Sequence, residues 1–177
     1  AVYVFVRQGS TWSQQAYLKP AAVGSTQAGD QFGIAVAVSG DTIIVGANGE
    51  DSGSTGINSS PNESELSSGA AYIFARRGSK WSQQAYLKPA SVGATQSSDQ
   101  FGASVGIWGD TAIVGAPYEN SSSTGINSSP NENSVASGAA YIFQRGGAKW
   151  TQQAYLKPAA FGTTMAADQF GTSVGIA

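Results

Sequence analysis

The acidic side chains that could take part in chemistry recur at a spacing of 69 residues. Asp30, which stands before Gln-Phe-Gly, returns as Asp99 and Asp168, and Asp41, in a Gly-Asp dipeptide, returns as Asp110. Carboxylates are good ligands for calcium, but a calcium ion takes roughly six to eight oxygen atoms. Each position supplies one carboxylate. We therefore expect turn roles, Asp41 and Asp110 within a hairpin and the other three as acceptors of backbone N–H groups.

Two further pairs of acidic residues lie in one loop segment, and paired carboxylates can serve glycoside hydrolysis. The pairs and their counterparts 69 residues later are Glu50-Asp51 with Glu119-Asn120, and Glu63/Glu65 with Glu132/Ser134. The second acid of each pair is lost in the later copy. A pair that is lost between near-identical copies is better explained as solvated surface than as a catalytic site.

Composition removes several classes of chemistry. The chain has no cysteine and no histidine, which excludes disulfides, thiolate or imidazole metal sites and Ser-His-Asp triads within it. Its formal net charge is -2 and its nine Lys and Arg residues are scattered, so nucleic acid is not an expected partner. No apolar stretch is long enough to span a membrane, so membrane insertion is not expected either.

The whole chain repeats with the same period. Residues 1–38 match 70–107 and 139–176, and residues 39–69 match 108–138. A fixed period indicates stacked copies of one structural unit, each burying its apolar surface against its neighbours. We interpret the chain as an excerpt of a longer repeat protein. Its expected divisions are a partial unit at 1–31, complete units at 32–100 and 101–169, and the first strand of a further unit at 170–177.

Each complete unit is expected to be a four-stranded antiparallel meander. In the second unit the strands are predicted at 101–108, 111–116, 139–145 and 150–158. The Gly-Asp dipeptide between the first two suits a type II′ hairpin. The first strand is rich in small residues, whereas the fourth is polar and ends at a proline, as suits an outer edge strand. This taper is typical of a β-propeller blade, whose inner strands converge on an axis.

Burial should follow the period as well. We expect Val36, Val105 and Val174 to be buried in equivalent places, and Tyr72 and Tyr141 likewise.

Three short motifs occur in a fixed order: Phe101-Gly102, Gly115-Ala116-Pro117, and Gly-Ala-Ala-Tyr-Ile-Phe at 138–143. With their recurrence, they resemble the FG-GAP repeat of integrin-alpha-like propellers. The resemblance covers essentially the whole chain. It implies an all-β fold of propeller blades, with seven blades in a closed ring, and here either a partial propeller or an open blade array.

The resemblance also implies where calcium would bind. In integrin blades the ion lies in the hairpin between the first and second strands, held by an Asp-x-Asp-x-Asp-Gly type of loop. Here that hairpin offers Asp41 or Asp110 alone, and Asp30 and Asp99 are weaker candidates nearby. We therefore expect neither calcium nor another cofactor.

A long loop separates the second and third strands, and it carries acceptor sequences for N-glycosylation. It runs for some twenty residues, 48–68 and again 118–137, far beyond the usual hairpin length of about two to five. The acceptor asparagines are Asn58, Asn62, Asn120 and Asn127.

Three function classes remain open. The first is a non-enzymatic structural or adhesive repeat module, extracellular or on the cell surface, whose partners are further blades of the parent chain or identical subunits. This class is favoured because every apparent functional feature recurs in the repeat, whereas catalysis usually needs one set of different residues that occurs once. The second is a propeller that binds a glycan or a protein through the face rich in long loops. The third is a calcium-dependent integrin-like binder or an enzyme scaffold.

Overall fold

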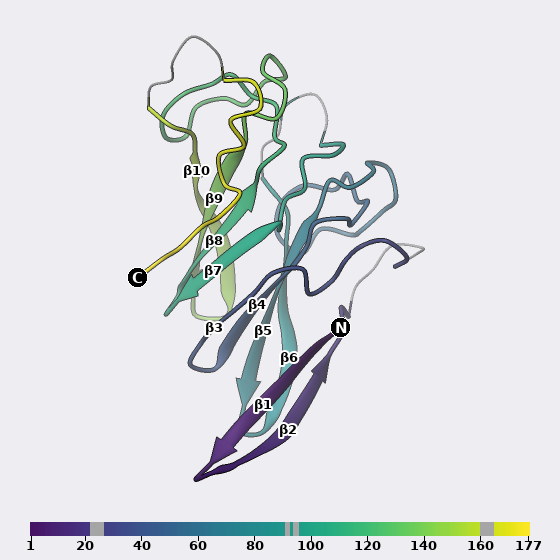
Figure 1. Cartoon of the computed structure of the whole chain (residues 1–177), viewed down its shortest axis with the longest axis vertical. Helices are drawn as coiled ribbons and strands as arrows, with labels where there is room; N and C mark the ends of the chain where they lie inside the picture. Colours follow the sequence, from purple (N-terminus) through teal and green to yellow (C-terminus); the bar gives the residue numbers. More distant parts are fainter. Residues whose placement is uncertain (22–26, 91–92, 94–95, 160–164) are drawn as a thin grey trace.

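The computed structural model describes residues 1–21, 27–90, 93, 96–159 and 165–177. Across these residues the chain forms ten β-strands, arranged as a hairpin and two four-stranded antiparallel sheets (Figure 1). The strands are β1 (Val2–Gln8), β2 (Thr11–Leu18), β3 (Val36–Ser39), β4 (Thr42–Ala47), β5 (Ala70–Arg77), β6 (Lys80–Leu87), β7 (Ser104–Trp108), β8 (Thr111–Ala116), β9 (Ala139–Gly146) and β10 (Lys149–Leu156). Nowhere in the described ranges is there a helix long and apolar enough to cross a membrane.

Both sheets are meanders in which consecutive strands are neighbours. The first blade has the order β3-β4-β5-β6 and the second has β7-β8-β9-β10. The hairpin β1-β2 lies beside the first blade, with β2 in contact with β6. Figure 1 shows these units as an open array with the long loops gathered at one end. The predicted all-β fold of four-stranded antiparallel blades, repeated every 69 residues, is confirmed.

Local geometry repeats with the period. Each hairpin between the first two strands places glycine at φ +56°, in Gly40 and Gly109, while the aspartate that follows keeps a negative φ. A type II′ turn requires this combination. The pairing of the third and fourth strands is irregular at one equivalent place in all three hairpins.

Two predicted strands differ from the structure by more than two residues. The first strand of the second blade starts at Ser104 instead of residue 101, because Phe101 forms a single parallel bridge with Gly69 and Gly102 turns the chain at φ +92°. The strand expected at 170–177 does not form: Phe170 makes only the equivalent bridge to Gly138. A strand is defined by its ladder, and none of the described residues pairs with 172–177 as β4 pairs with β3.

The phenylalanine of the Phe-Gly motif is the centre of each blade's aromatic core. Phe101 is fully buried, with its ring 5.3 Å from that of Tyr141 and 6.0 Å from that of Phe143, both edge-on. Phe32 meets Tyr72 and Phe74 in the same way. Such edge-to-face contacts add to the stabilisation from burial.

The expected equivalence of burial holds for the tyrosines and fails for the valines. Tyr72 and Tyr141 are both buried, but Val36 is 55% exposed and Val105 and Val174 are half-buried. The cause is position in the array. Val105 lies on the face of β7 that packs against the first blade, whereas Val36 faces the β1-β2 hairpin, which has no inner strands to cover it.

The aromatic core generates a first prediction. Phe101→Ala should lower the free energy of unfolding by roughly 3–5 kcal/mol, because it empties a fully buried site. Phe170→Ala, at an equivalent but only half-buried position, should cost clearly less. Urea unfolding followed by tryptophan fluorescence measures both. Equal losses would contradict the assignment of Phe101 as a core anchor.

Candidate functional site: buried polar clusters and an open apolar face

A buried polar cluster ties the long loop to the fourth strand of the second blade. Glu119 accepts a hydrogen bond from the Tyr155 hydroxyl at Oε1, 3.0 Å, and from the Lys157 ammonium at Oε2, 3.0 Å. Lys157 also donates to Ser137 Oγ at 2.7 Å and to the carbonyl oxygen of Gly138 at 2.6 Å. All three protons of the ammonium group therefore have an acceptor.

The first blade repeats the cluster. The Tyr86 hydroxyl donates to Glu50 Oε1 at 3.1 Å, and Lys88 donates to Ser68 Oγ at 2.8 Å and to the Gly69 carbonyl oxygen at 2.7 Å. Lys88 Nζ lies 3.8 Å from Glu50 Oε2. Burial lowers the pKa of Lys88 to about 8, an effect that the Glu50 carboxylate partly opposes. Burial likewise raises the pKa of Glu50, although Lys88 lowers it.

The expectation that these acids are solvated surface is wrong for Glu50 and Glu119. They are 3% and 4% exposed, because the long loop folds back and closes over them. The sequence did contain a signal: each glutamate is retained together with a tyrosine and a lysine at the same offsets. The structure also explains why Asp51 is replaced by Asn120 in the second copy. Asp51 accepts a hydrogen bond from the backbone N–H of Ser67, and Asn120 accepts the equivalent bond from the backbone N–H of Ala136. Only the acceptor oxygen is needed there, so the negative charge is dispensable.

Among the described residues, the side chains of the aspartates before the Phe-Gly motif make none of the expected turn contacts. Asp30 and Asp99 are both 6% exposed, and Asp99 Oδ1 has no hydrogen-bond partner in the described part of the chain. Their backbone carbonyl oxygens hold the junction instead, accepting from the N–H groups of Gly49 and Tyr118. Asp168, the third copy, is exposed.

Burial, followed by the carboxylates of Glu119 and Glu132, raises the pKa of Asp99 to about 8. Burial also raises the pKa of Asp30, with Glu63 and Asp51 acting in the same direction. At both aspartates, burial and the neighbouring carboxylates thus favour the neutral form more than solvent would.

The hairpin aspartates are paired with arginines. Arg145 Nε donates to Asp110 Oδ1 at 2.6 Å, and its guanidinium lies 5.4 Å from the ring centre of Trp150. Asp41, Arg76 and Trp81 repeat this arrangement. One carboxylate already occupied by an arginine does not fit a calcium site. Within the described ranges no group of three or more His, Cys, Asp or Glu residues could hold a metal ion.

The glycosylation candidates differ in how their amides are used. Asn58 and Asn127 are exposed, with left-handed backbone at φ 56° and 57°, and each accepts the backbone N–H of a tyrosine in the fourth strand through Oδ1. Asn62 is exposed and accepts from the Gly53 N–H. Asn120 is half-buried, and its Nδ2 donates to Glu132. The amide nitrogen that would carry a glycan is therefore least accessible at Asn120.

Neighbouring units are joined by hydrogen bonds between their outer strands. Trp150 Nε1 donates to Gln84 Oε1 at 2.8 Å, and Trp81 Nε1 donates to Gln15 Oε1 at 2.8 Å. Each outer strand is thus bonded to the outer strand of the preceding unit. Further inward, Arg145 donates to Thr42 Oγ1 at 3.0 Å.

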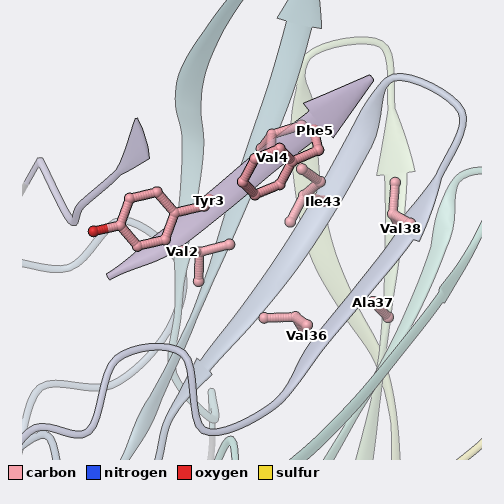
Figure 2. A pocket seen from close by; sticks show the side chains of 8 residues that line it. All are labelled: Val2, Tyr3, Val4, Phe5, Val36, Ala37, Val38 and Ile43. Atoms are coloured by element: carbon pink, nitrogen blue, oxygen red, sulfur yellow. The ribbon is translucent and has the colours of Figure 1, made fainter. Parts of the chain in front are cut away.

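The same kind of face lies open beside the hairpin. Side chains of β1 on one side and of β3 and β4 on the other line an apolar groove of about 260 Å³ (Figure 2). The lining residues are Val2, Tyr3, Val4, Phe5, Val36, Ala37, Val38 and Ile43. Trp12 is 62% exposed, whereas its counterpart Trp150 is 4% exposed. The lining residues of β3 correspond to those of β7, which β3 and β4 cover between the two complete blades. In the described chain no inner strands cover this face of β3.

Comparison with known protein families decides what kind of unit repeats. The FG-GAP repeat matches residues 12–74 and 81–143. The chain belongs to the FG-GAP repeat family. A search of curated proteins found no match.

The two FG-GAP repeats straddle the blade boundaries. Each matched segment begins in a fourth strand, β2 or β6, and ends in the third strand of the next blade, β5 or β9. The sequence unit therefore contains the blade junction itself. The junction consists of the segment that connects the fourth strand of one blade to the first strand of the next, here called the crossover, the Phe-Gly motif within it, and the long loop that carries the buried glutamate.

The buried lysine generates a second prediction. Lys157→Met should destabilise the fold by roughly 3–5 kcal/mol, because it leaves the Glu119 carboxylate buried without its cation. Lys19→Met is the matched control, since Lys19 is the equivalent residue but is exposed; it should change stability by less than about 0.5 kcal/mol. Urea unfolding at neutral pH compares the two. If the Lys157→Met protein is as stable as the Lys19→Met protein, the buried cluster does not stabilise the folded chain and the prediction is wrong.

The hairpin pair generates a third prediction, concerning calcium. Because Arg145 occupies the Asp110 carboxylate, we expect the melting temperature to be the same with millimolar calcium as with chelator. A rise with calcium that disappears in Asp110→Ala would contradict this and restore the integrin type of site.

Proposed function

We propose that this FG-GAP repeat chain is a non-enzymatic structural or adhesive module of an extracellular or cell-surface protein, in which blades follow one another in an array. The observation that carries the proposal is the apolar face beside the β1-β2 hairpin. Its large exposed side chains include Phe5, Val36 and Val38. A contiguous apolar surface of this kind marks an interaction site.

The partner that fits this face is the inner half of another blade. Between the two complete blades, β3 and β4 lie against β7, and Ile107 of β7 is buried. Val38 is the counterpart of Ile107 in the repeat and is exposed. A pair of strands with the sequence pattern of β3 and β4, supplied by the parent chain or by an identical subunit, would cover Val38 as β3 and β4 cover Ile107.

The acidic residues support a structural role. Glu50 and Glu119 are buried and bonded to tyrosine and to the loop backbone, and Asp41 and Asp110 are paired with arginine. Groups held in this way fix loops and hairpins. Exposed Asn58, Asn62 and Asn127 would carry glycans if the protein is secreted by a host that glycosylates.

A second candidate function is ligand binding on the long-loop face. A shallow cavity of about 340 Å³ lies between the crossover and the long loop of the second blade. It is lined by Ser98, Gln100, Tyr118, Asn120, Val135 and Ala136. Hydroxyl and amide groups beside an exposed tyrosine ring suit a polar ligand such as a glycan or a peptide. Loss of binding in a glycan or peptide screen on Tyr118→Ala would favour this function.

The repeat itself provides the fourth prediction. A copy of residues 32–69 fused in front of Ala1 continues the 69-residue register, because Ala1 corresponds to Ala70. The added strands should pair with β1, complete the unit to which the β1-β2 hairpin belongs, and cover the apolar face. We expect a higher melting temperature and reduced binding of a hydrophobic dye.

The control is the same fusion with Val45→Asp in the added copy, which places a charge at a position that is fully buried in β4. This fusion should neither stabilise the protein nor reduce dye binding. If both fusions behave like the original chain, the open face is not a blade interface and the array proposal fails.

A further inference from the structure

The crossover between the two complete blades is clamped between their long loops. On one side the Ser98 N–H donates to the carbonyl oxygen of Leu66 at 2.8 Å, and the Gln100 N–H donates to that of Ser67 at 3.1 Å. On the other side the Asp99 carbonyl oxygen accepts from the second long loop. The side chain of Asp99 is therefore enclosed where the two blades meet.

The groups that face Asp99 come from every element around it. The second long loop contributes Glu119 and Glu132, the first contributes Glu65, and the end of β6 contributes Lys88. Tyr141 of β9 and Lys157, which follows β10, also lie within electrostatic reach. Three carboxylates thus oppose a negative charge on Asp99. The two ammonium groups that would favour it already bond to their own serine and glycine partners.

Charge on Asp99 has little to stabilise it in this place. Its Oδ1 atom is buried without a hydrogen-bond partner in the described residues. A buried charged oxygen without a donor is costly, whereas a protonated carboxyl carries no net charge and removes the repulsion from its neighbours. The geometry therefore favours a bound proton at the junction.

We propose that Asp99 is a proton-dependent lock of the blade junction: when neutral it allows the crossover to pack between the two long loops, and its ionisation loosens this contact. The array would then be held most tightly in mildly acidic surroundings and would open at the junction as the pH rises.

The direction of the pH effect follows from proton linkage. The pKa of Asp99 is raised to about 8 by burial and by Glu119 and Glu132, from the ordinary aspartate value of 3.8 that applies to a solvated side chain. Between these values the folded state binds more protons than the unfolded state, so stability falls as the pH rises and the loss is complete above about pH 8. The raised pKa values of Glu50 and Asp30 act in the same direction. Lys88, with a pKa lowered to about 8, acts oppositely, but only above that pH.

The chain contains its own control for this proposal. Asp168 occupies the same place in the repeat but is exposed. Unfolding in urea is to be measured from pH 5 to pH 8 for the original chain, for Asp99→Asn and for Asp168→Asn.

We expect the folding equilibrium constant of the original chain to fall across this range, with up to about a tenfold loss per pH unit for each proton released. Asp99→Asn should show a clearly shallower fall, with the remainder due to Asp30 and Glu50, and Asp168→Asn should follow the original chain. Equal pH dependence in Asp99→Asn and the original chain would overturn the proposal.

A local measurement distinguishes an opening junction from general loss of stability. Hydrogen exchange, corrected for the intrinsic pH dependence, should show protection at Ser98, Gln100 and Phe101 falling from pH 6 to pH 8 before that of β8. A uniform fall over the whole chain would contradict a junction lock. If Asp99→Asn does not fold, titration of the Asp99 carboxyl by carbon NMR in the original chain decides the matter, because a midpoint near the ordinary value for aspartate would overturn the proposal.

Discussion

Close approach of backbones at the Phe-Gly motif is the constraint on which the rest of the structure depends. A β-carbon on Gly46 would lie 2.0 Å from the carbonyl oxygen of Gly102, and one on Gly102 would lie 2.2 Å from that of Ala70. The same contacts recur between Gly115 and Gly171. Backbones at this distance leave no room for a β-carbon at these positions, so the repeat must keep glycine in these places.

This packing determines what happens to the polar groups around it. With the inner strands in contact, the long loops and crossovers are pressed together at one end of the blades, and the acidic residues there lose solvent. Lys88 and Lys157 reach into this region from the outer strands and bond to the loop backbone. A buried ion pair adds little net stability compared with apolar packing. Its role here is to fix one conformation of a twenty-residue loop that contains no strand of its own.

Much of the fold was predictable because each strand and turn pattern occurs two or three times at the same offset, so an ambiguous pattern in one copy is resolved by the others. Strands, hairpins and blade order followed from patterns that recur at the same offsets, and the hairpin aspartates were correctly placed in turns. Burial of Glu50 was not predictable in that way, because it depends on a loop closing over the end of the sheet, which no local pattern reveals. The exposure of Val36 was also missed, since identical sequence positions differ when a neighbouring blade covers one and not the other.

The central claim is that every blade face of this kind is made to be covered by the inner strands of a further blade. A structure of the chain extended by one more repeat at its N-terminal side tests it most directly. The account predicts that Val38 becomes buried, as Ile107 is, and that Val36 becomes half-buried, as Val105 is. It also predicts that the indole N–H of Trp12 donates to a glutamine of the added outer strand, as Trp81 donates to Gln15. A structure in which the added repeat folds while Val36, Val38 and Trp12 stay exposed would contradict it.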